Sequence, residues 1–127
     1  AEVELKRGER LMRRRDWKGA RLAFERAVSL NPREAEYYGY LAWATFEAEP
    51  GDRVERAKAA LRLVRKALAQ SPALDRLQVI AAVLEDEAGD PAQARARLLK
   101  VLRASPSLQL AKHALQGLNR RHGAGPA

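Results

Sequence analysis

Residues 17–32 read WKGARLAFERAVSLNP, and their spacing occurs twice more along the chain. The stretch places a small residue at Ala20, a bulky apolar residue at Phe24, a small residue at Ala27 and a proline at Pro32. The same spacing follows at Ala60, Val64, Ala67 and Pro72, and then at Ala94, Leu98, Val101 and Pro106. The three prolines are 40 and 34 residues apart. A period near 34 residues is typical of stacked helical hairpins, so we predict a repeat architecture.

Composition agrees with an all-α fold. The chain has 127 residues, enough for one domain with a core. It is rich in Ala, Leu and Arg, which favour helix, and no alternating apolar run is long enough to predict a strand. The absence of cysteine excludes disulfides and thiolate metal sites, and no apolar run is long enough to span a membrane.

Caps and breakers divide the chain into seven expected helices. Prolines, Gly51 and Gly89 mark the ends, and Asp16, Asp52 and Asp90 are placed to cap the helices that follow. We expect helices at about 2–14, 17–30, 34–48, 53–70, 74–88, 91–104 and 108–121. As repeats, these give 2–32, 33–72 with an insertion near 47–54, and 73–106. A capping helix at 107–122 and a flexible tail at 123–127 complete the predicted domain, 1–127.

These residues resemble the tetratricopeptide repeat (TPR) family. The second half of the pattern matches in all three copies. The first half is less regular, because Gly8 and Leu11 match whereas Glu4 and Arg7 stand where apolar residues are usual. The resemblance implies an α-solenoid of three helical hairpins, in which the first helix of each pair lines a concave groove. It also implies a scaffold that holds a peptide or a helix of a partner protein, in the cytoplasm of a bacterium.

If the first helix of each hairpin lines the groove, its groove residues lie on the face opposite the apolar stripe that packs in the core. We expect an aromatic patch flanked by acidic residues, which suits an apolar or basic partner segment. The predicted groove residues are Glu9, Met12, Arg13, Tyr40, Trp43, Phe46, Glu47, Gln78, Glu85 and Asp86. An alternative places Trp43 and Phe46 in contact with neighbouring helices instead.

One branch of the family binds the C-terminal carboxylates of heat-shock chaperones through Lys and Asn. Here the corresponding stretches show Leu5, Glu9, Tyr40 and Ala82, so we do not expect that specificity.

The formal net charge of +8 leaves a second function open. A basic module could dock on nucleic acid. However, the basic residues are scattered over most helices, and the clusters Arg13-Arg14-Arg15 and Arg120-Arg121-His122 lie at helix C-termini, where the helix dipole favours cations. We therefore do not favour nucleic acid as a partner. Self-association into a homo-oligomer is a third alternative.

No pattern in the sequence indicates catalysis. The two histidines, His113 and His122, lie in the last helix or its tail, and no glycine-rich phosphate loop follows a strand. We expect a protein that is not an enzyme and that has no cofactor and no metal. Because the chain starts at Ala1 and ends in Gly-Ala-Gly-Pro-Ala, we also expect a fragment of a longer protein.

Overall fold

The computed structural model describes residues 2–123, and those residues form seven helices and no strand. The helices are α1 (Glu2–Arg13), α2 (Trp17–Leu30), α3 (Ala35–Ala48), α4 (Arg53–Gln70), α5 (Asp75–Glu87), α6 (Pro91–Ala104) and α7 (Gln109–His122). Each agrees with its predicted range to within one residue at either end. The all-α fold is therefore confirmed, whereas most of the predicted tail, residues 124–127, lies outside the described residues.

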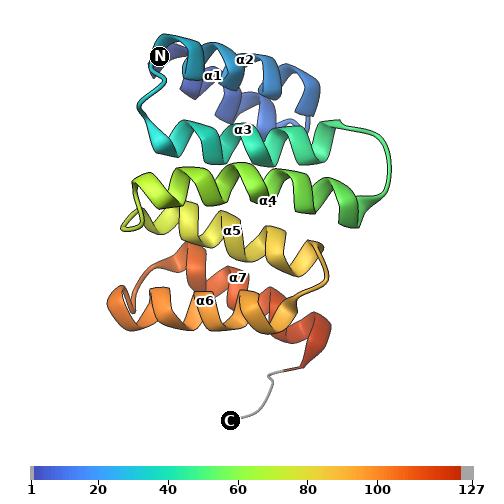
Figure 1. Cartoon of the computed structure of the whole chain (residues 1–127), viewed down its shortest axis with the longest axis vertical. Coiled ribbons are helices and arrows are strands. Elements are labelled where there is room, and N and C mark those ends of the chain that lie inside the picture. Colours follow the sequence, from blue (N-terminus) through green and yellow to red (C-terminus); the bar gives the residue numbers. More distant parts are fainter. Residues whose placement is uncertain (1, 124–127) are drawn as a thin grey trace.

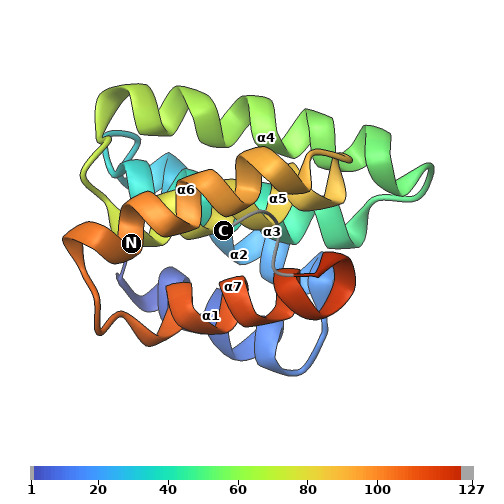
Figure 2. The ribbon, with the colours of Figure 1, turned by 90° about the horizontal axis from the view of Figure 1, so that it is seen from below.

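The hairpins α1–α2, α3–α4 and α5–α6 follow one another along the long axis, with α7 packed at the end (Figure 1). Every helix packs on the next one in the chain, and in addition α3 contacts α5 and α5 contacts α7. The first helices of the hairpins thus form one layer, which α7 continues. Seen along the long axis, α4 lies on one side of the molecule and α1 and α7 lie on the other (Figure 2).

The three prolines mark equivalent corners. The residues before them, Asn31, Ser71 and Ser105, have φ of −144°, −141° and −135° and ψ of 78°, 69° and 73°. Proline disfavours the helical conformation in the residue before it, so each second helix ends there. In each corner the amide three residues after the cap donates to the carbonyl of the cap residue. The corners therefore turn the chain in the same way three times.

Aspartate caps start the second helices. The side chains of Asp16, Asp52 and Asp90 accept hydrogen bonds from the amides of Gly19, Glu55 and Gln93, at 3.0, 2.9 and 3.1 Å. Each bond satisfies an amide that the first turn of a helix leaves unpaired. Helix α4 has 18 residues, whereas α2 and α6 have 14 each, and the connection between α3 and α4 covers residues 49–52.

The core is a row of three clusters rather than one centre. One cluster joins α1, α2 and α3, a second joins α3, α4 and α5, and a third joins α5, α6 and α7. All nine non-proline residues of the repeated spacing are buried. In the first hairpin, α1 approaches α2 at Gly8, where a methyl group would overlap the ring of Phe24. Small residues such as Gly8 thus allow neighbouring helices to pack closely.

Candidate functional site

The inner layer is hollowed by a groove of about 400 Å³. Four elements line it: α1, α3, α5 and the start of α7. We call this cavity the inner groove, and its lining residues are Met12, Tyr40, Trp43, Arg76, Val79, Ile80, Val83, Leu108 and Leu110. Most of these side chains are apolar, so the groove offers a mostly apolar surface that is open to a ligand.

Helical spacing explains why these side chains converge. On α3, Tyr40 and Trp43 are three residues apart, and on α5 the lining residues recur at intervals of three and four from Arg76 to Val83. Residues with that spacing share one face of a helix. The opposite faces of α3 and α5 enter one core cluster through residues such as Ala42 and Leu84. Tyr40 and Val79 on the groove faces are buried members of the two neighbouring clusters, so these clusters form the floor of the groove.

A small hydrogen-bonded network of Arg76, Tyr40 and Glu36 borders the groove. The guanidinium of Arg76 donates to the Tyr40 hydroxyl at 2.7 Å, and that hydroxyl donates to Glu36 at 3.2 Å. Arg76 also lies 3.5 Å from the Glu36 carboxylate. Burial raises the pKa of Tyr40, although the bond from Arg76 opposes the shift, and the bond to Tyr40 raises the pKa of Arg76. The network holds Tyr40 in place, while its ring stacks on Phe24 with the centroids 5.4 Å apart.

Three of the predicted site residues meet in the inner groove. Met12, Tyr40 and Trp43 come from two helices and line the same cavity. Glu9 lies close enough to this end of the groove to contribute to the raised pKa values of Tyr40 and Arg76. Arg13 is exposed at the end of α1 and does not line the cavity.

Phe46 does not line the groove, which corrects the prediction for this residue. It is 1% exposed and packs in the cluster of α3, α4 and α5. The guanidinium groups of Arg53 and Arg56 lie 4.8 and 5.4 Å from its ring centroid. Three residues turn a helix by about 300°, so Phe46 points about 60° away from Trp43 and toward α4.

Gln78 and Glu85 face α6 instead of the groove, which corrects a second prediction. Arg97 of α6 donates to both oxygens of Glu85, at 2.8 and 2.9 Å, and to the side-chain oxygen of Gln78 at 2.6 Å. Glu85 is 1% exposed. A buried carboxylate requires such a partner, because its desolvation is costly. The pair therefore joins α5 to α6 and is not open to a ligand.

Asp86 and Glu47 are also engaged within the chain, contrary to their predicted role. Asp86 accepts from Arg121 and contacts the His122 ring nitrogen, both at 2.7 Å, so it attaches α7 to α5. Its side chain is 8% exposed. Glu47 lies 3.4 Å from Arg53, which also binds Glu87 of α5 at 2.6 Å. The acids expected to select a basic ligand thus link helices to one another.

Comparison with known proteins identifies the architecture. The Arabidopsis OM64 TPR domain aligns with a TM-score of 0.72 over 94% of both chains at 21% identity. The first TPR of Spaghetti (RPAP3), bound to the HSP90 peptide SRMEEVD, aligns with a TM-score of 0.71 over 94% of this chain and 90% of that one at 14% identity. The chain has the fold of a TPR domain. No protein-family profile and no curated protein matches the sequence.

Within this TPR fold, sequence reasoning missed the contributions of α5 and α7. Arg76, Val79 and Val83 line the groove, whereas we predicted Gln78, Glu85 and Asp86 on that face. Arg76, Val79 and Val83 recur at intervals of three and four residues, which is the spacing of one helix face. A second face of the same helix shows an equally regular apolar spacing, so the pattern does not decide which of the two faces lines the groove. Leu108 and Leu110 complete the groove through the turn into α7, and no local pattern predicts where that turn lies in space.

Two classes of site have no counterpart in the described chain. Among residues 2–123, no three or more His, Asp or Glu side chains are arranged so that they could hold a metal ion. None of the seven described helices combines the length and the apolar character that crossing a membrane requires.

Proposed function

We propose that this chain is a protein-interaction module that binds an apolar segment of a partner protein in the inner groove. The observation that carries the proposal is the convergence of Met12, Trp43, Val83 and Leu110 from four helices on one open cavity. Apolar cavities of this size with a few polar groups are the usual ligand sites of proteins. The RPAP3 domain of the same fold is bound to a peptide, which supports this use of the fold.

The lining determines which partner chemistry fits. Among the lining residues that the structure describes, Arg76 alone is charged, and the others except Tyr40 are apolar or aromatic. Glu47, Glu85 and Asp86 are paired with arginines, so they do not favour a basic ligand. A half-buried aromatic side chain such as Trp43 offers a ligand a large contact area for little loss of conformational freedom. We therefore propose a mainly apolar partner segment. We do not propose that this chain binds the HSP90 peptide that is bound to the RPAP3 domain.

The proposed module is organised as three repeats and a cap. The hairpins α1–α2, α3–α4 and α5–α6 would be the repeats, with residues 47–54 as an insertion in the second and α7 as the capping helix. The four lining elements of the groove come from all of these parts. Its work would be binding and not catalysis, without a cofactor.

A matched pair of exposed leucines tests the groove. Leu110 lines it and is 46% exposed, whereas Leu99 on α6 is 43% exposed and lies outside it. A peptide is first selected on the unmodified protein from a displayed random library. We expect Leu110→Glu to weaken its binding about 10-fold or more, because a carboxylate is placed against the apolar ligand, and Leu99→Glu to leave binding unchanged.

Trp43 supplies an independent signal. In a Trp17→Phe background Trp43 is the only tryptophan of the chain, so its emission reports on the groove. A peptide bound there shifts the emission to shorter wavelength, because it removes water from the indole. Equal binding by the Leu110→Glu and Leu99→Glu variants, with no change in Trp43 emission, would place the ligand elsewhere and contradict the proposal.

Docking on nucleic acid through the terminal basic clusters is less favoured by the structure. Arg121 and His122 are held by Asp86 of α5, so this cluster is partly neutralised. A salt titration separates the two functions. Phosphate contacts lose affinity steeply with salt, whereas an apolar groove does not.

A further inference from the structure

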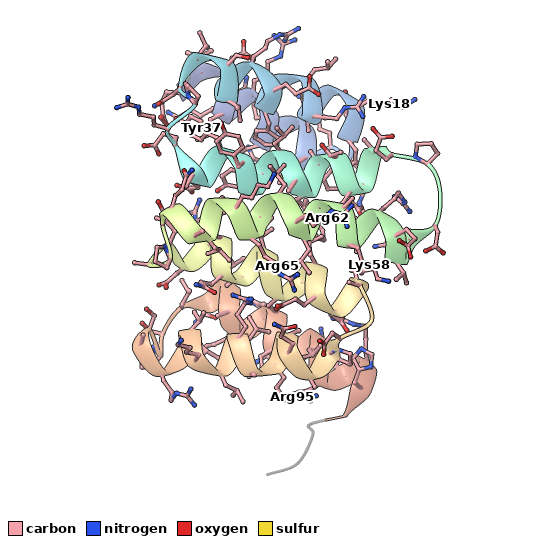
Figure 3. The ribbon with its side chains drawn as sticks, in the orientation of Figure 1. Lys18, Tyr37, Lys58, Arg62, Arg65 and Arg95 are labelled. Atoms are coloured by element: carbon pink, nitrogen blue, oxygen red, sulfur yellow. The ribbon has the colours of Figure 1, made fainter. Side chains whose placement is uncertain are left out.

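A second groove lies between α4 and α6, over the C-terminal end of α5, and has a volume of about 400 Å³. We call it the outer groove. One wall is formed by Lys58, Arg62 and Arg65 of α4. Figure 3 shows these three side chains along one edge of α4, the edge next to α5. Leu61 and Ala88 add an apolar part to the lining, so the groove combines a cationic wall with a small apolar surface.

The three cationic side chains of this wall form few and weak ion pairs within the chain. Arg62 forms no ion pair with any residue in the range 2–123. Lys58 pairs with Glu55 at 3.5 Å, but both side chains are at least half exposed, so water screens the pair. Arg65 is 51% exposed and its carboxylate partner, Glu85, is 4.0 Å away. All three are thus available to an external anion.

The carboxylates in the outer groove do not cancel this charge. Glu85 is buried and already accepts two hydrogen bonds from Arg97, so Arg97 rather than Arg65 neutralises it. Asp90 is the N-cap of α6, and its carboxylate accepts a hydrogen bond from the backbone amide of Gln93. With Glu85 neutralised in this way, the cationic wall is in excess.

We propose that the outer groove binds an acidic peptide segment of a partner, separately from the inner groove. Lys58, Arg62 and Arg65 are four and three residues apart, so they form one row about 10 Å long. Alternate side chains of an extended peptide are about 7 Å apart on the same side, so two carboxylates of such a peptide lie within reach of this row. Arginine binds a carboxylate through two parallel hydrogen bonds, which suits Arg62 and Arg65 to this ligand.

A peptide fits the groove better than nucleic acid does. No aromatic side chain is among the described lining residues, so there is no platform on which a base could stack. The row is only about 10 Å long, and Asp90 and Glu55 end it on either side, so it is too short to follow a phosphate backbone that continues past it. A short acidic segment with an apolar residue for Leu61 and Ala88 avoids both problems.

The test uses a fluorescein-labelled probe of sequence Asp-Glu-Asp-Leu-Glu-Asp-Glu-Asp and fluorescence anisotropy at low salt. We expect the Arg62→Ala/Arg65→Ala variant to bind about 10-fold more weakly than the unmodified protein, and Arg62→Glu/Arg65→Glu to abolish binding. Both positions are exposed on α4, so we expect the variants to keep their helicity. Leu110→Glu in the inner groove should leave probe binding unchanged, which separates the two sites.

Arg7→Ala/Arg10→Ala is the control for net charge. It removes two exposed arginines from α1, where neither forms an ion pair within residues 2–123, and lowers the net charge by the same amount. The proposal requires nearly unchanged binding by this control. An equal loss in both double variants would show that only the overall charge attracts the probe, and would overturn the proposal. Binding of an oligothymidine through Arg62 and Arg65, without binding of the peptide probe, would overturn it in favour of nucleic acid.

Discussion

Two glycines show how single residues set the packing of this fold. Gly8 lets α1 approach the ring of Phe24, which is fully buried. Gly117 in α7 meets only the flexible ends of Arg121 and Arg120, at 3.2 and 3.7 Å from an added Cβ. The same change at the two positions should therefore have opposite effects.

We expect Gly8→Ala to lower the free energy of unfolding by about 1–3 kcal/mol, because the Phe24 ring has no space to move. Gly117→Ala should raise it by about 0.5–1 kcal/mol, because alanine is the better helix former and the half-exposed Arg121 guanidinium needs only a small shift, which leaves its pair with Asp86 in place. Urea unfolding followed by circular dichroism measures both. A stabilised Gly8→Ala protein would show that α1 does not pack tightly on α2.

At the scale of elements, ion pairs join helices that pack against one another, both within a hairpin and between α5 and α7. Arg97 holds Glu85 and joins α6 to α5, and Asp86 holds Arg121 and joins α5 to α7. The pair of Glu85 and Arg97 is the more buried, with side-chain exposures of 1% and 21%. Breaking such a pair costs more than replacing it, because the remaining charge stays buried.

Arg97→Met should lower the free energy of unfolding by about 3 kcal/mol, because the buried Glu85 carboxylate loses both of its hydrogen bonds from Arg97. The double variant Glu85→Leu/Arg97→Met should recover most of this loss, because no charge is left without a partner. The measurement is a double-mutant cycle by urea unfolding. Simple additivity of the single variants, Glu85→Leu and Arg97→Met, would contradict the coupling that the structure implies.

At the scale of the whole molecule, the core clusters form a chain in which each touches only its neighbours. The first cluster contains residues of α1, α2 and α3, and the last contains residues of α5, α6 and α7. The stability of such a stack is approximately a sum of local and nearest-neighbour contributions. A destabilising substitution at one end of the stack should therefore lower the local stability mainly at that end.

Leu118→Ala tests this, because Leu118 is 1% exposed in the last cluster. We expect a loss of about 2–5 kcal/mol and faster amide hydrogen exchange in α6 and α7, with the smallest change in α1 and α2. Leu99→Ala, at an exposed position of α6, should leave exchange close to that of the unmodified protein. A uniform increase over all seven helices would show that the domain opens as a single unit.

Much of the fold could be predicted from sequence because its signals are local. Asp16, Asp52 and Asp90 start helices by capping their own first turns, and the prolines end others. One local signal was missing: Arg15 turns the chain at φ of 61°, a conformation that usually selects glycine, as at Gly89 with φ of 96°. The turn forms there nonetheless, since the amides of Arg15 and Asp16 donate to the carbonyls of Met12 and Leu11 at the end of α1, both at 2.9 Å.

The candidate site was only partly predictable. Met12, Tyr40 and Trp43 were predicted and meet in the inner groove, whereas Phe46, Gln78 and Glu85 turn away from it. One residue along a helix is a rotation of about 100°, so a small error in rotation exchanges a groove face for a core face.

The sequence by itself determined the number of helices, their ends and the threefold spacing, because each depends on residues within a few positions of one another. Only the tertiary structure decided which charges are free, since Glu85, Asp86 and Glu47 find their arginines on other helices, 12, 35 and 6 residues away along the chain. It also decided that Leu110 of α7 and Met12 of α1 line one cavity. The physical reason is that both the pairing of charges and the shape of the groove depend on how the hairpins stack, which no local pattern encodes.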